Sequence, residues 1–219
     1  MELLLIRHAQ SANNALPEHR RVEDPGITDL GQRQAAALAA AFGGWQVDHL
    51  ITSAFRRALM TTHAIYSAGQ APTPVVWTEL HESGGCYAGH EPGRMVGRPG
   101  MNAREIASHF PGFRISGEIP DTGWWSSRPW ETDEQARDRA RGQARRLSTS
   151  FAAAERVACV IHADFKAMLL AELLGDAWRD WQHVSLCNTG VTRLHCESSG
   201  ARVLAFNNLD HLDPSLVSD

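Results

Sequence analysis

The chain has 219 residues, of which 43% are hydrophobic, and its formal net charge at pH 7 is −4. This length favours one large domain over two small ones, and the hydrophobic fraction is ordinary for a globular protein with a sizeable core. The negative net charge argues against a general nucleic-acid binder, which normally carries a surplus of basic residues.

The predicted elements alternate between strands and helices along the chain. The first half is predicted to contain, in order, strand Glu2–Ile6, helix Asp29–Phe42, strand His49–Thr52, helix Ala54–Ala68 with Ser53 as its N-cap, and strand Val75–Trp77. The second half is predicted to contain helix Ala103–Phe110, helix Thr132–Ala154, strand Val157–Ile161, helix Phe165–Leu174, and strands near Val191–Cys196 and Arg202–Phe206. This alternation predicts a three-layer α/β/α fold with a doubly wound, mostly parallel sheet.

The segment from about residue 90 to 130 has a different composition, rich in Gly, Pro and Trp. A connection of this length is usually functional when it is ordered. Trp124, Trp125 and Trp130 favour order, because large aromatic rings need burial. We therefore expect a single domain over residues 1–219 with an inserted cap at about 90–130. The three tryptophans either form the core of this cap or stack on a substrate.

The cysteines and the apolar runs of the sequence indicate the cellular compartment in which the protein is expected. Cys86, Cys159, Cys187 and Cys196 form no CxxC pair and are expected to be reduced thiols. The apolar start reaches Arg7 too soon for a signal peptide, and no apolar run approaches the roughly 20 residues that span a membrane. We expect a cytoplasmic protein with neither a membrane nor a nucleic-acid partner.

Histidine and arginine gather where three predicted strands end. The first strand leads into Arg7 and His8, the second into Ser53 with Arg56 and Arg57 beyond it, and the fourth into His162. Ligands bind beyond the carboxyl ends of strands in open α/β sheets. Guanidinium groups neutralise a phosphate dianion, and a neutral imidazole can attack phosphorus. The pattern predicts phosphoryl-transfer chemistry at this edge.

A leaving alkoxide needs a proton, which a carboxylic acid can supply. The turn TELHESGG after the third strand offers Glu79 and Glu82, of which Glu82 is favoured. A metal site is not expected, because His81, Cys86 and His90 match no common zinc spacing.

Several motifs resemble those of the histidine phosphatase superfamily, also called phosphoglycerate-mutase-like. RHAQSANN is similar to its Arg-His-Gly-(Glu/Gln)-(Ser/Thr)-x-x-Asn signature, with Ala9 in place of the glycine. Further matching segments, in the right order, are ITDLGQRQA, SAFRRALMT with Arg57, LHESGGCYAG with Glu82, VIHADF with His162, and NNLDHL. The resemblance covers nearly the whole chain.

The resemblance implies a reaction without a metal or an organic cofactor. His8 would accept the phosphoryl group, with Arg7, Arg57 and His162 holding it. Glu82 would protonate the leaving group and then activate water. Asn14, the backbone N–H of Ala163, and Ser11, which supports the same loop, complete the expected substrate-binding set.

Three functions are compatible with this reading. The favoured one is a phosphatase that hydrolyses a small-molecule phosphate monoester. A phosphoglycerate-mutase-type phosphomutase is the alternative, with closure by the 90–130 segment; Arg94, Arg98 and Arg104 there either reach a second anionic group or are solvated. A catalytically silent phospho-ligand-binding module is the third. The oligomeric state is left open, a homodimer included.

Overall fold

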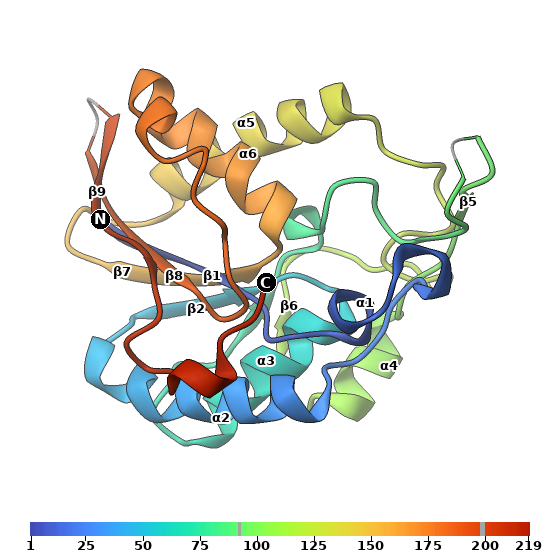
Figure 1. Cartoon of the computed structure of the whole chain (residues 1–219), viewed down its shortest axis with the longest axis horizontal. Helices are drawn as coiled ribbons and strands as arrows, with labels where there is room; N and C mark the ends of the chain where they lie inside the picture. Colours follow the sequence, from blue (N-terminus) through green and yellow to red (C-terminus); the bar gives the residue numbers. More distant parts are fainter. Residues whose placement is uncertain (92, 198–199) are drawn as a thin grey trace.

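The computed structural model of the chain describes residues 1–91, 93–197 and 200–219 (Figure 1). A seven-stranded sheet lies at its centre. The strand order is β6 (Arg114–Ile115), β3 (Val75–Val76), β2 (His49–Thr52), β7 (Arg156–Ile161), β1 (Glu2–Arg7), β8 (Val191–Glu197) and β9 (Gly200–Asn208). The first five strands run parallel, while β8 and β9 are antiparallel to their neighbours. The prediction of a mostly parallel α/β sheet is confirmed.

Helices cover both faces of the sheet, as the alternation of buried side chains on β1 requires. Leu4 and Ile6 pack against α2 (Asp29–Phe42) and α3 (Arg56–Ser67) on one face. Leu3 and Leu5 pack against α5 (Asp133–Ser150) and α6 (Ala163–Leu174) on the other (Figure 1). Successive strand side chains point to opposite faces, so a strand that is apolar throughout must be buried between two layers.

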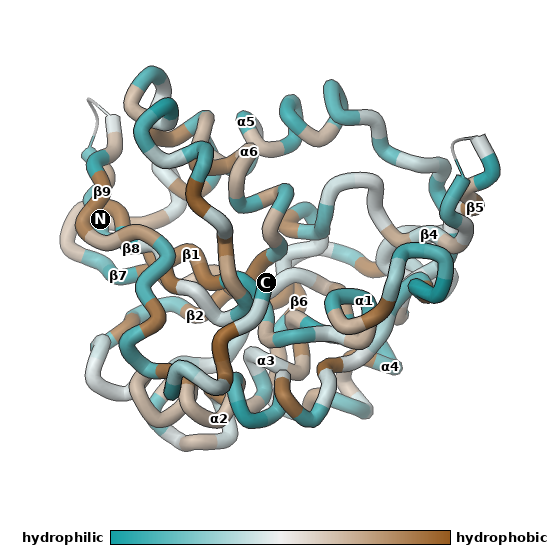
Figure 2. The backbone as a smooth tube through the Cα atoms, in the orientation of Figure 1, coloured by the Kyte–Doolittle hydropathy of each residue, from teal (hydrophilic) through white to brown (hydrophobic). Residues whose placement is uncertain are grey.

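The hydropathy pattern agrees with these layers. Figure 2 shows hydrophobic stretches along β1 and a largely hydrophilic α5. In α5 the buried positions form one narrow stripe, Ala136, Ala140, Gln143 and Leu147, which suits a helix covering the outside of a sheet. Within the described residues, no helix combines the length and the apolarity needed to cross a membrane.

The largest differences between predicted and observed helix ends concern α3, α5 and α6. The predicted Ser53 N-cap is wrong, because Phe55 is the N-cap of α3 and makes no side-chain capping bond. The predicted range of helix α5 is Thr132–Ala154. Thr132 is instead its N-cap, with a hydroxyl that accepts the Gln135 N–H, and the helix ends at Ser150. Helix α6 begins two residues earlier than predicted, directly after His162.

The 90–130 segment contributes to the sheet as well as to its surroundings. It contains β5 (Val96–Gly97), which pairs with β4 (Tyr87–Ala88), and helix α4 (Ala103–His109). It also supplies β6, an edge strand of the main sheet that the sequence analysis missed. Trp124 and Trp125 are buried in a cluster that includes Phe55, whereas Trp130 is half-buried beside Tyr87.

Candidate active site

Three neighbouring strands bring the two predicted histidines to one edge of the sheet. β1 and β2 both pair in parallel with β7, so their carboxyl ends lie at the same edge. His8, Ser53 and His162 follow directly after β1, β2 and β7. The ring centroids of His8 and His162 are 5.1 Å apart, and His162 Nε2 lies 2.8 Å from the Ser53 hydroxyl.

The contacts of His8 fix which ring nitrogen carries the proton. Arg57 Nε lies 3.0 Å from His8 Nε2, and His8 Nδ1 lies 2.8 Å from the Ala9 carbonyl oxygen. A guanidinium can only donate and a carbonyl can only accept, so Nε2 bears the lone pair and Nδ1 the proton. Burial and the charges of Arg57 and Arg7 lower the pKa of His8 well below its usual range. His8 is therefore neutral near pH 7, with Nε2 able to act as a nucleophile.

The backbone around His8 is held on both sides. The His8 N–H donates to the Ile161 carbonyl (2.9 Å), and Asn188 Nδ2 donates to the His8 carbonyl (3.0 Å). The buried Ala9 donates its N–H to Thr61 Oγ1 (3.0 Å). Ala9 is not among the residues with a positive φ, so alanine meets no backbone strain at the position where the family signature has glycine.

Two buried guanidinium groups form no ion pair within the described residues. Arg7 and Arg57 are 7% and 8% exposed, and neither forms an ion pair with a carboxylate of the described residues. Arg7 Nη1 donates to the Leu186 carbonyl (2.6 Å). The Nε of Arg7 is buried and has no hydrogen-bond partner among the described residues. Buried charges in proteins are normally paired. This arrangement therefore indicates a site for an anion.

His162 is the second neutral ring of the site. It is fully buried, and its Nδ1 has no hydrogen-bond partner within residues 1–91, 93–197 and 200–219. Burial, followed by the charge of Arg57, lowers its pKa well below the usual range. A bound dianion would reverse this effect and favour the protonated ring, because an opposite charge nearby stabilises the charged form.

The carboxylate of Glu82 lies at the N-terminus of α6. Its Oε1 accepts the N–H groups of Ser83 and Phe165, both at 2.9 Å, and its Oε2 accepts a longer bond from the Asp164 N–H at 3.4 Å. Burial and the neighbouring Asp164 carboxylate raise the pKa of Glu82, although Arg57 opposes them. A raised pKa keeps this carboxyl protonated closer to neutral pH, as a proton donor requires.

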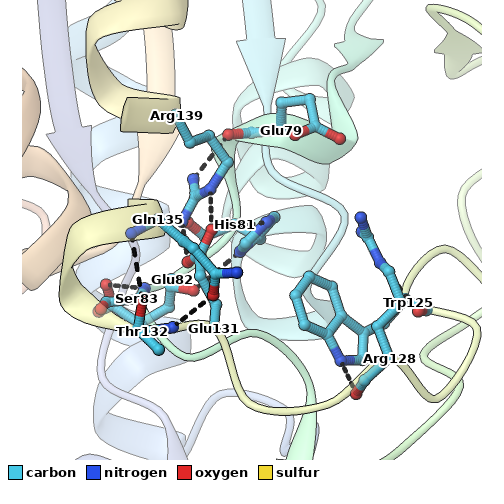
Figure 3. Close-up of polar contacts among 10 residues, drawn as sticks. All are labelled: Glu79, His81, Glu82, Ser83, Trp125, Arg128, Glu131, Thr132, Gln135 and Arg139. Atoms are coloured by element: carbon cyan, nitrogen blue, oxygen red, sulfur yellow. Dashed lines mark hydrogen bonds and ion pairs between the residues drawn. The ribbon is translucent and has the colours of Figure 1, made fainter. Parts of the chain in front are cut away.

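Arg139 of α5 fixes the turn that carries Glu82 (Figure 3). Its Nη1 donates to the carbonyls of Glu79 (2.8 Å) and His81 (3.0 Å). Its Nε and Nη2 each lie 2.7 Å from a different oxygen of Glu131. Both partners of this pair are buried. A two-pronged buried pair of this kind holds its surroundings in one geometry.

The three expected substrate-binding residues differ in placement. Ser11 is the N-cap of the short helix α1 (Ala12–Ala15), and it donates its N–H (3.0 Å) and its hydroxyl (2.8 Å) to Oδ1 of Asn14, the third residue of that helix. Asn14 lines the site cavity, whereas the buried Ser11 does not. Ala163 also lines it, and as the first residue of α6 its N–H lacks a partner within the helix.

Most of these groups line one cavity of about 440 Å³, whereas His162, which contacts the His8 ring, does not line it. His8, Arg7, Arg57 and Glu82 form its buried end. The alternatives weighed from the sequence lie elsewhere: Glu79, Arg56, Arg94, Arg98 and Arg104 do not line this cavity. Arg94 forms an exposed ion pair with Glu91 at 2.8 Å, and the Arg56 N–H donates to Asp24 (2.8 Å).

Comparison with known proteins decides the family. The model of the histidine phosphatase superfamily (branch 1) matches residues 3–209. The chain belongs to this superfamily.

Members and structural neighbours of this superfamily include several phosphatases. The chain is 28% identical over 185 residues to the glucosyl-3-phosphoglycerate phosphatase of Mycolicibacterium vanbaalenii, covering 82% of this chain and 76% of that protein. It is similar in fold to a mycobacterial glucosyl-3-phosphoglycerate phosphatase in complex with VO3, with TM-score 0.65, 22% identity, and 95% and 99% of the two chains covered. A phosphoserine phosphatase mutant from Entamoeba histolytica gives TM-score 0.66, 22% identity, and 96% and 98% coverage.

Some residues that build this histidine phosphatase site were missed by the sequence analysis. Arg139 and Glu131 brace the turn of Glu82, and Asn188 holds the backbone of His8. Lys166, fully buried, donates from Nζ to the Gly190 carbonyl (2.9 Å). None of these belongs to a motif at a strand end. The only signal that could have singled out Lys166 is a lone lysine within an otherwise apolar helical pattern.

Proposed function

We propose that this chain is a phosphatase that hydrolyses a phosphate monoester of a small molecule through a phosphohistidine intermediate on His8. The observation that supports it most directly is a neutral His8 whose Nε2 contacts the buried guanidinium of Arg57, in a cavity that the buried guanidinium of Arg7 also lines. A phosphate dianion supplies the missing counter-ion, and its phosphorus is the electrophile that Nε2 requires.

In the first step, Nε2 of His8 attacks phosphorus, and the bond between phosphorus and the ester oxygen breaks. Arg7 and Arg57 offset the charge on the non-bridging oxygens. The Nδ1–H bond to the Ala9 carbonyl stabilises the ring as it becomes positively charged. Asn14 Nδ2 and the Ala163 N–H, both on the cavity wall, are further donors to the phosphoryl group, whereas His162 lies beside the His8 ring and outside the cavity lining.

Glu82 transfers its proton to the departing alkoxide, so that a neutral alcohol leaves. In the second step the ionised Glu82 accepts a proton from water, which attacks the phosphohistidine and regenerates His8. The raised pKa of Glu82 supports the first role, and its position beside the cavity supports both.

The placement of the arginines favours a phosphatase over a phosphomutase. A mutase must hold a second anionic group of its substrate during transfer. Arg94, Arg98 and Arg104, the candidates of the 90–130 segment for that contact, lie outside the cavity, and beyond the phosphate end Arg21 is the one arginine of the described residues that lines it.

Phosphate release from a panel of monoesters tests the proposal. The panel includes glucosyl-3-phosphoglycerate and phosphoserine, after the names of the similar proteins, together with para-nitrophenyl phosphate. We expect wild type to release phosphate from at least one ester and His8→Asn to lose that activity by about 10³-fold or more. Equal rates for the two proteins would contradict the proposal.

A further inference from the structure

The site cavity extends from the phosphate-binding end to a second region near the surface. We call this region the outer cavity and define it by Glu18, Arg21, Glu23, Tyr87, Trp130 and Asp133. Its four charged side chains are exposed, whereas the two aromatic residues are half-buried. A leaving group attached to a phosphate at His8 extends into this region, because the buried end is occupied by the phosphoryl group.

Two aromatic rings form one wall of the outer cavity. Tyr87 and Trp130 are packed edge to face, with centroids 4.4 Å apart. The Trp130 ring also covers Gly84, where a Cβ atom would come within 2.5 Å of the indole. The indole is thereby held in place. The faces of fixed aromatic rings bind apolar carbon and positively charged groups.

The charges of the cavity outside its phosphate end are mostly negative. Glu18, Asp133 and Asp164 line it, and none of the three forms an ion pair within the described residues. Glu23 has only a distant partner, with 4.0 Å between its Oε1 and the Nε of Arg98. Arg21 is the one arginine on the wall of the outer cavity. An anionic leaving group therefore meets more repulsion than attraction here.

Among the acidic residues that line the cavity, Asp164 is the one beside the proton donor Glu82. It is the second residue of α6, it lines the cavity, and its N–H donates to Glu82 Oε2. Because Asp164 and Glu82 both line the cavity, we place the Asp164 carboxylate on the side from which Glu82 protonates the ester oxygen. A negative charge on the first carbons of the leaving alcohol would face it directly.

We propose that this cavity selects phosphate monoesters whose leaving alcohol carries no negative charge, favours a positively charged alcohol over a neutral one, and uses Asp164 as a specificity-determining residue. The inference rests on the proposed phosphatase function and adds the substrate class. The carboxylates attract an ammonium group, the aromatic wall accommodates it, and the same carboxylates reject a carboxyl group.

A matched series of two-carbon esters tests the inference. Aminoethyl, hydroxyethyl and carboxymethyl phosphate differ mainly in the charge of the leaving group, which is positive, neutral and negative. We expect kcat/KM to fall in that order, with about tenfold or more between the first and the last, equivalent to about 1.4 kcal/mol. Raising the salt concentration should reduce the differences in kcat/KM among the three esters, because exposed charges are screened.

The variants are Asp164→Asn and Asp133→Asn, with Asp29→Asn as the control. Asp29 is an exposed residue in the first turn of α2 and does not line the cavity, so its replacement reproduces the loss of an acidic side chain at a helix start. The readout is the ratio of kcat/KM for aminoethyl phosphate to that for carboxymethyl phosphate at one pH. Effects common to both esters, including any change in the ionisation of Glu82, cancel in this ratio.

We expect the ratio to fall by about threefold or more in both cavity variants and to stay at the wild-type value in Asp29→Asn. A wild-type ratio of one or less would overturn the inference, as would a ratio that neither cavity variant changes. If His8-dependent hydrolysis of para-nitrophenyl phosphate persists in that case, the proposed function stands while the substrate class fails. If no ester is hydrolysed in a His8-dependent manner, both fail.

Discussion

Arg57 Nε donates to His8 Nε2 over 3.0 Å, so one guanidinium group both sets the tautomer of the histidine and contributes charge to the anion site. Arg57 is the second residue of α3, and His8 follows β1. The packing of α3 on the sheet, chiefly on β7 and β2, therefore determines their contact. A phosphoryl group that approaches His8 Nε2 meets the rest of the Arg57 guanidinium, which connects binding with attack.

The first prediction concerns this pair. Arg57→Met should lower kcat/KM for para-nitrophenyl phosphate by about 10²–10³-fold, because it removes charge stabilisation of the transition state. It should also move the acidic limb of the pH profile to higher pH. Arg57 lowers the pKa of His8, so its loss raises that pKa, and His8 attacks only when neutral. Arg56→Met, outside the cavity, is the control, and an acidic limb that does not move would contradict the account.

The second prediction concerns Glu82. Glu82→Gln should lower kcat/KM, which reports formation of the phosphoenzyme, by about 10²-fold or more for alkyl phosphates and far less for para-nitrophenyl phosphate, whose leaving group departs without a proton. Asp164 raises the pKa of Glu82, so Asp164→Asn should move the basic limb of the alkyl-ester profile to lower pH. Equal losses on both ester classes would remove Glu82 from the role of proton donor.

The third prediction concerns the pair that braces the Glu82 turn. Arg139→Met leaves the Glu131 carboxylate buried without its partner, so we expect the free energy of unfolding to fall by about 3–5 kcal/mol. Urea denaturation measures this change. The exposed Arg179–Asp176 pair is the control, and Arg179→Met should cost less than about 1 kcal/mol. Similar decreases in the free energy of unfolding for the two variants would show that the buried Arg139–Glu131 pair stabilises the protein no more than an exposed ion pair does.

The fourth prediction concerns Lys166, whose buried position lowers its pKa to about 7. An unfolded lysine keeps its proton to about pH 10, so the unfolded state binds more protons than the folded state between about pH 7 and pH 10. The free energy of unfolding of wild type should therefore rise with pH in this window relative to Lys166→Met, by up to about 1.4 kcal/mol per pH unit. Parallel pH dependences in urea denaturation would refute it.

The central part of the fold and the buried end of the site could be predicted from local pattern. A strand such as β1, apolar on both faces, must lie between two layers, and polar residues at its carboxyl end reach the ligand edge. His8 and His162 were found by this rule, and their separation of 5.1 Å between ring centroids follows from the pairing of β1 with β7.

The remainder depends on tertiary contacts that no local pattern reveals. The two-residue strand β6 forms because its backbone pairs in parallel with β3 at the edge of the sheet. Arg139 lies on a helix full of arginines, and only the approach of the Glu79–His81 carbonyls distinguishes it from its neighbours. Trp130 and Trp125 share a composition signal, yet one lines the cavity and the other is buried in the core. Three-dimensional packing decides such cases.

Trapping the phosphoenzyme tests the central claim most directly. Wild type is mixed with a phosphate ester carrying labelled phosphorus, quenched within milliseconds under denaturing alkaline conditions, and digested to locate the label. The account predicts an acid-labile, base-stable phosphoryl group on His8, absent from His8→Asn and accumulating further in Glu82→Gln with an aryl ester, because the water step then lacks its base. Turnover of the same ester without any label on His8 would contradict the account.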